Sequence, residues 1–189
     1  MLFYQKGIAV KRIKYDNQVY FVTDEFIEVN RGFIKDLKEK CMLNRNRKSR
    51  LCTHKNVDSL IHEMIIVHTK DTYVRPHKHI NKIESFHVVE GLAKAVIFNE
   101  EGKIVKVSAL GNYSSGRNFY WKFEAPYYHA LIIESSFFVF HEITNGPFSK
   151  SETIFAPWSV EEGQPSEAKF MHEVRNKANK FFKSKGKKK

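Results

Sequence analysis

The sequence predicts a mainly β protein, an antiparallel sandwich or barrel flanked along the chain by one helix on each side. From residue 50 to about residue 155, short apolar runs rich in Val, Ile, Phe and Tyr alternate with turn residues. No helical stretch interrupts these runs, which is typical of sheets that pack face to face or close on themselves. Helical spacing of apolar residues occurs before this region and after it.

The first elements expected are a short strand over Val19–Val22 and a helix that Thr23 or Asp24 can cap and that runs to about Cys41. Thr and Asp are good N-caps because their side-chain oxygens accept hydrogen bonds from the first turn. The apolar residues of this helix recur near helical spacing: Phe26, Ile27, Phe33, Ile34, Leu37 and Cys41. One apolar face predicts a helix that packs on the outside of the core.

The central region contains seven apolar runs that we predict to be strands. They cover residues 61–67, 85–89, 93–98, 104–107, 119–123, 130–133 and 137–141. Residues 99–103, with the sequence Asn-Glu-Glu-Gly-Lys, are expected to form a hairpin turn between two of these strands.

The C-terminal region reads as a linker followed by a basic amphipathic helix. Residues 161–165 have the composition of a linker, and a helix is predicted over 166–182. Apolar and basic side chains lie on different faces of this helix: Phe170, Val174, Ala178 and Phe181 against Lys169, Arg175, Lys177 and Lys180. Such a helix can bind peripherally to a membrane, but packing on its own domain or on a partner subunit is the commoner outcome. We therefore divide the chain into an N-terminal strand and helix (1–49), a β-barrel domain (50–160) and the C-terminal extension (161–189).

The formal net charge of +11 comes partly from the C-terminus. Five lysines follow residue 182: Lys183, Lys185, Lys187, Lys188 and Lys189. We expect a disordered, solvated tail there. A second basic cluster at residues 45–50 lacks the interleaved aromatic residues of a single-strand binding site, so nucleic acid is not an expected partner.

The cysteine count and the hydropathy indicate a cytoplasmic protein. There are 2 cysteines, residues 1–15 show no signal-peptide pattern, and no apolar run approaches the roughly 20 residues that span a bilayer. We therefore expect a reducing compartment.

The residues most informative about function are two histidines and a glutamate at close spacing. His77 and His79 are two residues apart, so on a strand both side chains point to the same face. Glu84 follows across a tight connection, and Gly91 is expected to close the next turn. His129 begins another apolar run and can supply a fourth ligand from a neighbouring strand. Three imidazoles and one carboxylate suit a single divalent transition metal such as zinc, iron, manganese or nickel.

This spacing resembles the first signature of the cupin superfamily, and His129 stands at the end of the second. The chain departs from the pattern at two turns. Asp71 stands where a glycine is expected, and Glu124, Ala125 and Pro126 replace Pro-x-Gly. The resemblance implies a cupin-type double-stranded β-helix, or jelly roll, that holds the metal in its interior and often forms a homodimer.

A narrower resemblance runs from about residue 19 to residue 158. The chain is similar to the WbuC-type cupin metalloproteins of bacterial O-antigen gene clusters at residues 50–54, 59–64, 73–79, 82–87, 140–142, 146–148 and 155–158. This resemblance implies a metal-binding cupin in surface-polysaccharide metabolism and leaves its reaction open.

Several polar residues near the metal motif are candidates for acid–base catalysis: Lys82, His87, His141 and Glu142. Strand alternation from Glu84 favours the opposite face for His87, so a supporting hydrogen bond is the alternative for that residue. His141 and Glu142 could line the pocket or cap a strand. The candidates for substrate binding are Arg75, Tyr73 and Tyr128. A positive charge beside the metal favours an anionic substrate, and aromatic rings suit a sugar.

The leading interpretation is a small-molecule metalloenzyme that acts on a sugar-derived or anionic metabolite. Its metal would serve an isomerase or epimerase as a Lewis acid, or a dioxygenase if it is iron. Glu84 could instead stay unligated and act as a base. The alternatives are a metal-dependent sugar-binding or regulatory module without catalysis and an assembly protein docked through the basic helix. The sequence contains no Gly-rich phosphate loop and no Cys-x-x-Cys pair.

Overall fold

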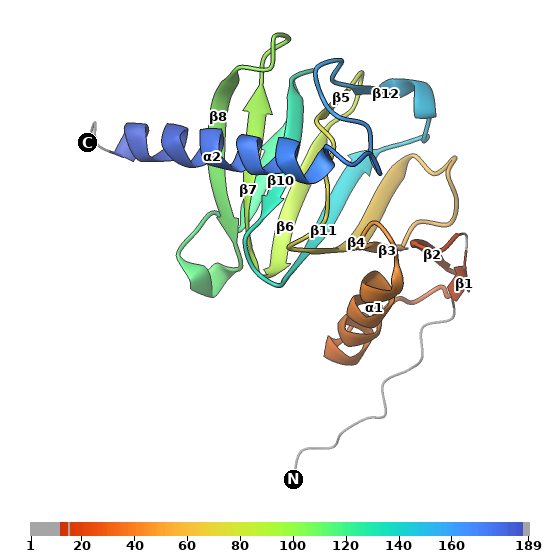
Figure 1. The fold of residues 1–189 in the computed structure, drawn as a ribbon. Helices are drawn as coiled ribbons and strands as arrows, with labels where there is room; N and C mark the ends of the chain where they lie inside the picture. Colours follow the sequence, from red (N-terminus) through yellow and green to blue (C-terminus); the bar gives the residue numbers. More distant parts are fainter. Residues whose placement is uncertain (1–11, 15, 187–189) are drawn as a thin grey trace.

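The protein is a sandwich of two β-sheets with one helix near each end of the chain (Figure 1). The structure, a computed structural model, describes residues 12–14 and 16–186. The larger sheet has the order β1 (Arg12–Lys14), β2 (Val19–Val22), β3 (Lys48–Cys52), β4 (Ile61–Thr69), β11 (Phe137–Asn145), β6 (Glu84–Glu90) and β9 (Tyr120–Phe123). The smaller sheet has the order β12 (Thr153–Phe155), β5 (His77–His79), β10 (Tyr128–Ile133), β7 (Leu92–Phe98) and β8 (Ile104–Gly111).

The strands from β4 to β11 follow the order of a jelly roll. β4, β11, β6 and β9 are neighbours in one sheet, while β5, β10, β7 and β8 are neighbours in the other. All pairings within these two groups are antiparallel. This is the double-stranded β-helix arrangement that the sequence predicted.

The main core lies between the two sheets and is built by strand alternation. Phe86 and Val88 of β6 and Phe138 and Phe140 of β11 point inward and are 3% exposed or less. They meet Ala93, Ala95, Leu131 and Ile133 from the smaller sheet. Because side chains on one strand alternate between faces, the inward direction of these residues fixes the direction of their neighbours.

Helix α1 (Arg31–Leu43) has its N-cap six or seven residues later than predicted. Its N-cap is Asn30, whose side chain accepts a hydrogen bond from the backbone N–H of Phe33 at 3.1 Å. Phe26, expected on the apolar helix face, lies before the helix and is 88% exposed. The packing prediction is confirmed, since Leu37 and Cys41 are buried on the outer face of the larger sheet.

The strand predictions are confirmed for β2 and for all seven central runs, although several strands are longer than expected. The strands outside the predicted runs are β1, β3, β5 and β12, of which β5 was treated as a strand only in the argument for His77 and His79. β3 begins inside the basic cluster. Lys48 and Arg50 interrupt the alternation of apolar and polar residues by which a strand is predicted. The hairpin at residues 99–103 is confirmed, with the N–H of Asn99 donating to the carbonyl of Lys103 at 3.0 Å.

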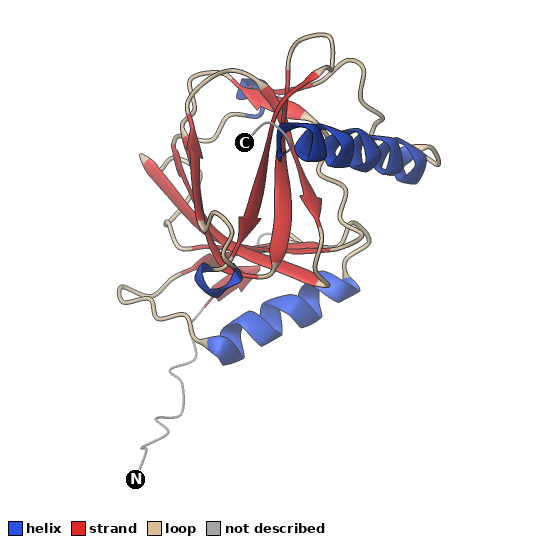
Figure 2. Cartoon of the chain, turned by 90° about the vertical axis from the view of Figure 1, so that its left-hand side faces the viewer, coloured by secondary structure: helices blue, strands red, loops and turns tan. Residues whose placement is uncertain are grey.

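Helix α2 (Glu167–Gly186) packs on the outer face of the smaller sheet (Figures 1 and 2). Val174 and Ala178 are buried there against Val96, Phe98 and Ile132. The prediction of a tail from Lys183 was wrong, because Lys183 and Lys185 continue the helix. Lysine is a good helix former, which is compatible with this extension. Lys187, Lys188 and Lys189 lie outside the described residues.

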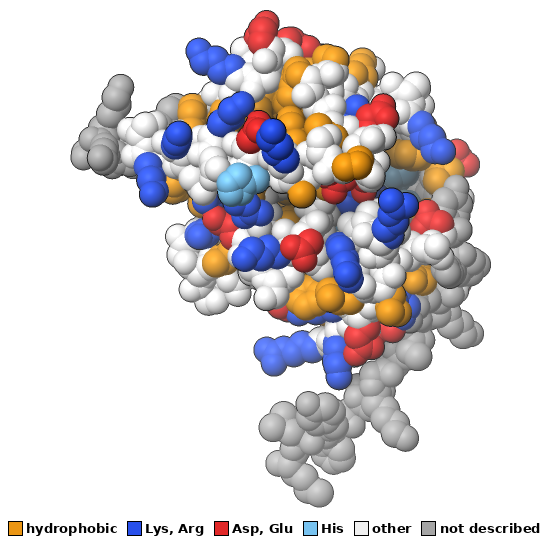
Figure 3. All heavy atoms as spheres, viewed as in Figure 1, with side chains coloured by type: hydrophobic (Ala, Val, Ile, Leu, Met, Phe, Trp, Pro, Cys, Tyr) orange, Lys and Arg blue, Asp and Glu red, His pale blue; other side chains and the backbone are white. Residues whose placement is uncertain are grey.

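The solvent-facing side of α2 is basic, and Figure 3 shows Lys and Arg side chains spread along it. Its apolar side is the side covered by the sheet. Within the described part of the chain, we find no helix with the length and apolar character needed to cross a membrane.

Candidate metal centre

Three histidines converge inside the jelly roll, between its two sheets. His77 and His79 lie on β5, and His129 on β10 is the direct cross-strand neighbour of His77. One ring nitrogen from each of the three lies within 4.8 Å of the others. The alternation that places His77 and His79 on one face, together with the β5–β10 register, is therefore sufficient to assemble the cluster.

The second ring nitrogen of each histidine is held by a neighbour. Nδ1 of His77 lies 2.8 Å from the carbonyl oxygen of Arg75, and Nδ1 of His129 lies 3.3 Å from the carbonyl of Tyr127. Nδ1 of His79 lies 3.1 Å from the hydroxyl of Thr153. A carbonyl oxygen accepts only, so Nδ1 of His77 and of His129 must carry the proton. In the neutral ring Nε2 then has a free lone pair, as a metal ligand requires.

Glu84, the first residue of β6, brings a carboxylate to the same point from the opposite sheet. Its Oε1 lies 3.0 Å from Nε2 of His79, and its Oε2 lies 3.3 Å from Nε2 of His129. The side chain is almost completely buried, and Oε2 has no partner with hydrogen-bond geometry among the described residues. Leaving a charged oxygen unsatisfied in this way costs more than about 1–3 kcal/mol. A cation shared with the imidazoles would remove that cost, so the four side chains fit a metal ion.

The protonation states of the cluster also suit a metal. Burial, together with His129 and His79, lowers the pKa of His77 to about 3, so the ring is neutral near pH 7. Burial alone would raise the pKa of Glu84, but the close contact of the carboxylate with the imidazoles of His129 and His79 outweighs it and holds the pKa below its usual range. Metal ligands must be deprotonated, as His77 and Glu84 are near pH 7.

Aromatic rings form one wall of the site. The ring of Phe123 lies 4.6 Å from that of His129, and the ring of Phe155 lies 6.2 Å from that of His77. His129 and Glu84 are buried, whereas His77 and His79 remain partly exposed. The exposed surface of the cluster therefore belongs to the two histidines of β5.

Of the four predicted acid–base residues, the structure turns only Glu142 toward the interior beside the cluster. It shares the inner face of β11 with Phe138 and Phe140. Burial and the charge of Glu84 raise the pKa of Glu142 to about 8. This carboxyl group therefore retains its proton near neutral pH.

His87 and His141 lie on the outer face of the larger sheet, away from the cluster. They are cross-strand neighbours in the β6–β11 register, and each is adjacent to an inward-facing residue. His87 is exposed and contacts the ring of Phe119, while Nε2 of His141 lies 3.7 Å from Glu63. The structure thus separates both residues from the candidate metal site.

The side chain of Lys82 is engaged with the end of β11 and the segment that follows it. Its Nζ donates to the carbonyl oxygens of Asn145 and Pro147, at 2.9 Å each, and pairs with Glu152 at 3.1 Å. An ammonium group has three protons to donate, so these contacts use its capacity.

The three predicted substrate-binding residues are not brought to the cluster. Tyr128 directly precedes His129, so alternation turns its ring to the outer face, where it packs beneath α2. The hydroxyl of Tyr73 donates to the carbonyl of Val160 at 2.7 Å, and its ring contacts Phe170 of α2. Nε of Arg75 donates to Ser159 at 3.0 Å, and its guanidinium lies over the ring of Phe155.

Sequence reasoning missed two inward polar residues, Thr144 and Arg50. Thr144 is the direct cross-strand neighbour of Glu84, and its hydroxyl is buried with no hydrogen-bond partner among the described residues. Arg50 shares the inner face of β3 with Cys52. The available signal for Thr144 was its even spacing from Glu142 along one strand.

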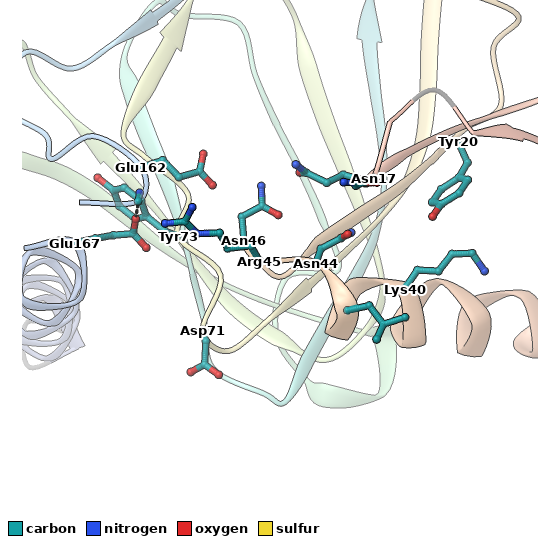
Figure 4. Close-up of a pocket in the computed structure, with 13 residues that line it drawn as sticks. Asn17, Tyr20, Lys40, Asn44, Arg45, Asn46, Asp71, Tyr73, Glu162 and Glu167 are labelled. Carbon is teal, nitrogen blue, oxygen red and sulfur yellow. Dashed lines mark hydrogen bonds between the residues drawn. The ribbon is translucent and has the colours of Figure 1, made fainter. Parts of the chain in front are cut away.

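A separate polar groove of about 810 Å³ lies outside the barrel (Figure 4). It lies between the end of α1, the residues just before β2 and the segment leading into α2, and its lining includes Asn17, Asn44, Arg45, Asp71 and Tyr73. None of the four candidate metal ligands lines it. The chemistry of the histidine cluster is therefore not located in this groove.

Comparison with known proteins adds one family match. Residues 29–110 match a family described as a domain of unknown function, DUF6016. The match includes His77, His79 and Glu84 and ends before His129. No curated protein matches the sequence.

Three solved structures illustrate the structural similarities. A protein from Shewanella oneidensis shares 9% identity over 55% of this chain and 66% of its own length, with a TM-score of 0.45. This chain thus spans just under two thirds of that protein. An uncharacterized conserved protein with a double-stranded β-helix domain from Klebsiella pneumoniae shares 13% identity over 58% of this chain and 79% of its own, with a TM-score of 0.44. The capsular polysaccharide assembling protein CapF from Staphylococcus aureus shares 16% identity over 57% of this chain and 29% of its own, with a TM-score of 0.46.

The strand order and the histidine cluster together define the class of the protein. The chain is a cupin-fold protein with a three-histidine cluster that is compatible with one metal ion.

Proposed function

We propose that this protein is a metal-dependent enzyme of the cupin type that acts on a small sugar-derived or anionic metabolite in surface-polysaccharide (O-antigen) synthesis. The observation that carries the proposal is the convergence of His77, His79 and His129 with the buried carboxylate of Glu84. These four side chains would hold zinc, iron, manganese or nickel. The metal would supply Lewis-acid polarisation of a substrate oxygen, or oxygen activation if it is iron.

Glu142 is the residue we assign to proton transfer. It lies on the inner face of β11, two residues from Thr144, which is the direct neighbour of Glu84. A carboxyl group with a pKa of about 8 can give a proton to a substrate oxygen and take one back near neutral pH. The unpartnered hydroxyl of Thr144 can orient a substrate beside it.

The assignment to surface-polysaccharide synthesis is supported by the resemblance to WbuC-type cupins. That resemblance includes the stretches that contain His77, His79 and Glu142. A metal-dependent sugar-binding module without catalysis would use the same cluster and would not need Glu142.

The test is solvent-proton exchange followed by NMR in D₂O. Protein purified without a metal-binding tag is incubated with sugar acids and nucleotide sugars under nitrogen, and with iron in air to detect oxygen uptake. We expect turnover that is reduced by about 10²-fold or more in Glu142→Gln and retained in Glu63→Gln, a carboxyl on the outer face. Metal-bound protein that binds a sugar with neither exchange nor oxygen uptake would instead identify the binding module.

A further inference from the structure

The inner face of the larger sheet carries a guanidinium group that no carboxylate holds. Arg50 on β3 points into the barrel, because Leu51 beside it is buried on the opposite face under α1. Its Nη1 lies 3.9 Å from the sulfur of Met64, a core residue of the neighbouring strand β4. The guanidinium is therefore directed along the inside of the sheet.

The strand register connects Arg50 to the metal site. Met64 is the direct cross-strand neighbour of Glu142 on β11, and Glu142 is in turn opposite Phe86 on β6. One step along the same inner face, Thr144 stands opposite Glu84. The inner face thus runs from Arg50 across Met64 and Glu142 to the histidine cluster.

The polar residues along this path keep part of their surface exposed. Arg50, Glu142, His77 and His79 all face inward, and all four are partly exposed rather than buried. The apolar residues Phe138 and Phe140 on the same inner face are, by contrast, at most 1% exposed.

Two other partly buried cations of the barrel have carboxylate partners. Lys48 pairs with Glu162 at 2.8 Å, and Lys94 pairs with Glu134 at 2.6 Å. For Arg50, no carboxylate of the described residues lies within ion-pair distance, and the sulfur of Met64 is a weak acceptor. The N–H donors of the planar guanidinium can therefore form two parallel hydrogen bonds to one oxyanion.

We propose that Arg50 binds the oxyanion group, a carboxylate or a phosphate, of an elongated substrate whose other end reaches the histidine cluster. The sulfur of Met64 contacts the guanidinium, and Glu142 lies between the two ends of the ligand. The metal-facing half of this inference rests on the proposed function, whereas the anion site itself does not. It assigns the positive charge that selects an anionic substrate to Arg50, in place of Arg75, whose guanidinium is engaged with Ser159 and Phe155.

The experiment is calorimetric titration of the full-length, zinc-loaded protein with glucuronate, glucose 6-phosphate and uncharged glucose. Four proteins are compared: wild type, Arg50→Gln, Arg50→Lys and Arg31→Gln. Arg31→Gln removes the same charge from an exposed position at the start of α1. Zinc content and thermal unfolding of each protein show that metal and fold are intact.

We expect at least one anion to bind wild type more tightly than glucose and to lose about tenfold or more in affinity in Arg50→Gln. Arg50→Lys should fall between the two, since it keeps the charge and loses the fork, and Arg31→Gln should match wild type. The preferred sugar identifies the oxyanion as carboxylate or phosphate. Equal affinities of wild type and Arg50→Gln, or no binding of either anion to wild type, would overturn the inference. If wild type takes up none of zinc, iron, manganese and nickel, the proposed function fails, and Arg50-dependent binding to the metal-free protein still decides whether the anion site exists.

Discussion

The carbonyl oxygen of Arg75 lies 2.8 Å from Nδ1 of His77, two residues further along the chain. Tyr127, directly before the neighbouring strand β10, stands in the same relationship to His129, two residues further along the chain. The backbone itself therefore orients two of the three rings and leaves their Nε2 atoms directed at the cluster. The carbonyl, rather than the side chain, is the contribution of Arg75 to the site.

The first prediction concerns the tautomers of these rings. In zinc-loaded protein, His77 and His129 should each carry the proton on Nδ1 and bind the metal through Nε2, because a carbonyl can only accept. Two-bond ¹H–¹⁵N correlation spectra distinguish the tautomers. Protonated Nε2 on either ring in the presence of zinc would contradict the arrangement.

The second prediction is a pH-dependent effect of Glu142→Gln on stability. Burial and Glu84 raise the pKa of Glu142 from 4.5 to about 8, so the native state retains a proton that the unfolded chain releases between these values. Stability that depends on this group therefore falls as the pH rises from about 4.5 to 8. Gln mimics the protonated carboxyl, so the metal-free variant should match wild type near pH 4.5 and exceed it by about 1–3 kcal/mol above pH 8. Urea unfolding in a chelator measures both, and a difference that does not change with pH would refute the burial of this group.

The third prediction tests the turn at Gly91, between β6 and β7. Gly91 has φ +87°, and an added Cβ would overlap the carbonyl oxygen of Phe137 and the hydroxyl of Ser135. Gly91→Ala should lower the free energy of unfolding by about 2 kcal/mol or more. Gly116→Ala is the matched control, because Gly116 also has positive φ, +70°, but open space around its Cβ position. Its cost should be about 1 kcal/mol, and equal losses in the two variants would show that the overlap at Gly91 is not real.

Much of this fold could be predicted because alternation and turn residues are local signals. The strand at Val19–Val22, the hairpin after Phe98 and the turn at Gly91 all follow from neighbouring residues. Strand β3 was not predicted, because Lys48 and Arg50 occupy inward positions that are usually apolar. The start of α1 was predicted too early, because Asp24 and Asn30 are both acceptable N-caps. The hydrogen bond from the backbone N–H of Phe33 to the side chain of Asn30 decides between them.

The sequence predicts only the part of the site that depends on the spacing of residues within one strand. His77 and His79 share a face by parity, but the position of His129 depends on the β5–β10 register. Parity also places His87 and Tyr128 away from the cluster, as each is next to an inward residue. The nearness of Arg50 to Glu142 requires the pairing of three strands, which no local pattern contains.

The fourth prediction concerns the end of α2. Lys183 and Ser184 are exposed, while Val174 and Ala178 carry the packing on the sheet. Truncation after Phe182 should shift the midpoint of thermal unfolding by only about 1–2 °C, since it removes little buried surface. Ala178→Asp, which places a charge in a fully buried position, should cost about 3 kcal/mol or more. A large loss on truncation alone would show that the last residues are docked.

The central claim, one metal held by the histidine cluster, is tested most directly by elemental analysis of protein purified without a metal-binding tag. We predict about one divalent transition metal per chain in wild type, and loss of that metal in the double variant His77→Ala, His79→Ala. The double variant His87→Ala, His141→Ala removes two histidines from the outer face and should retain the metal. Full metal occupancy in the His77, His79 variant, or a wild-type protein that binds no transition metal when supplied with zinc, iron, manganese and nickel in turn, would contradict the claim.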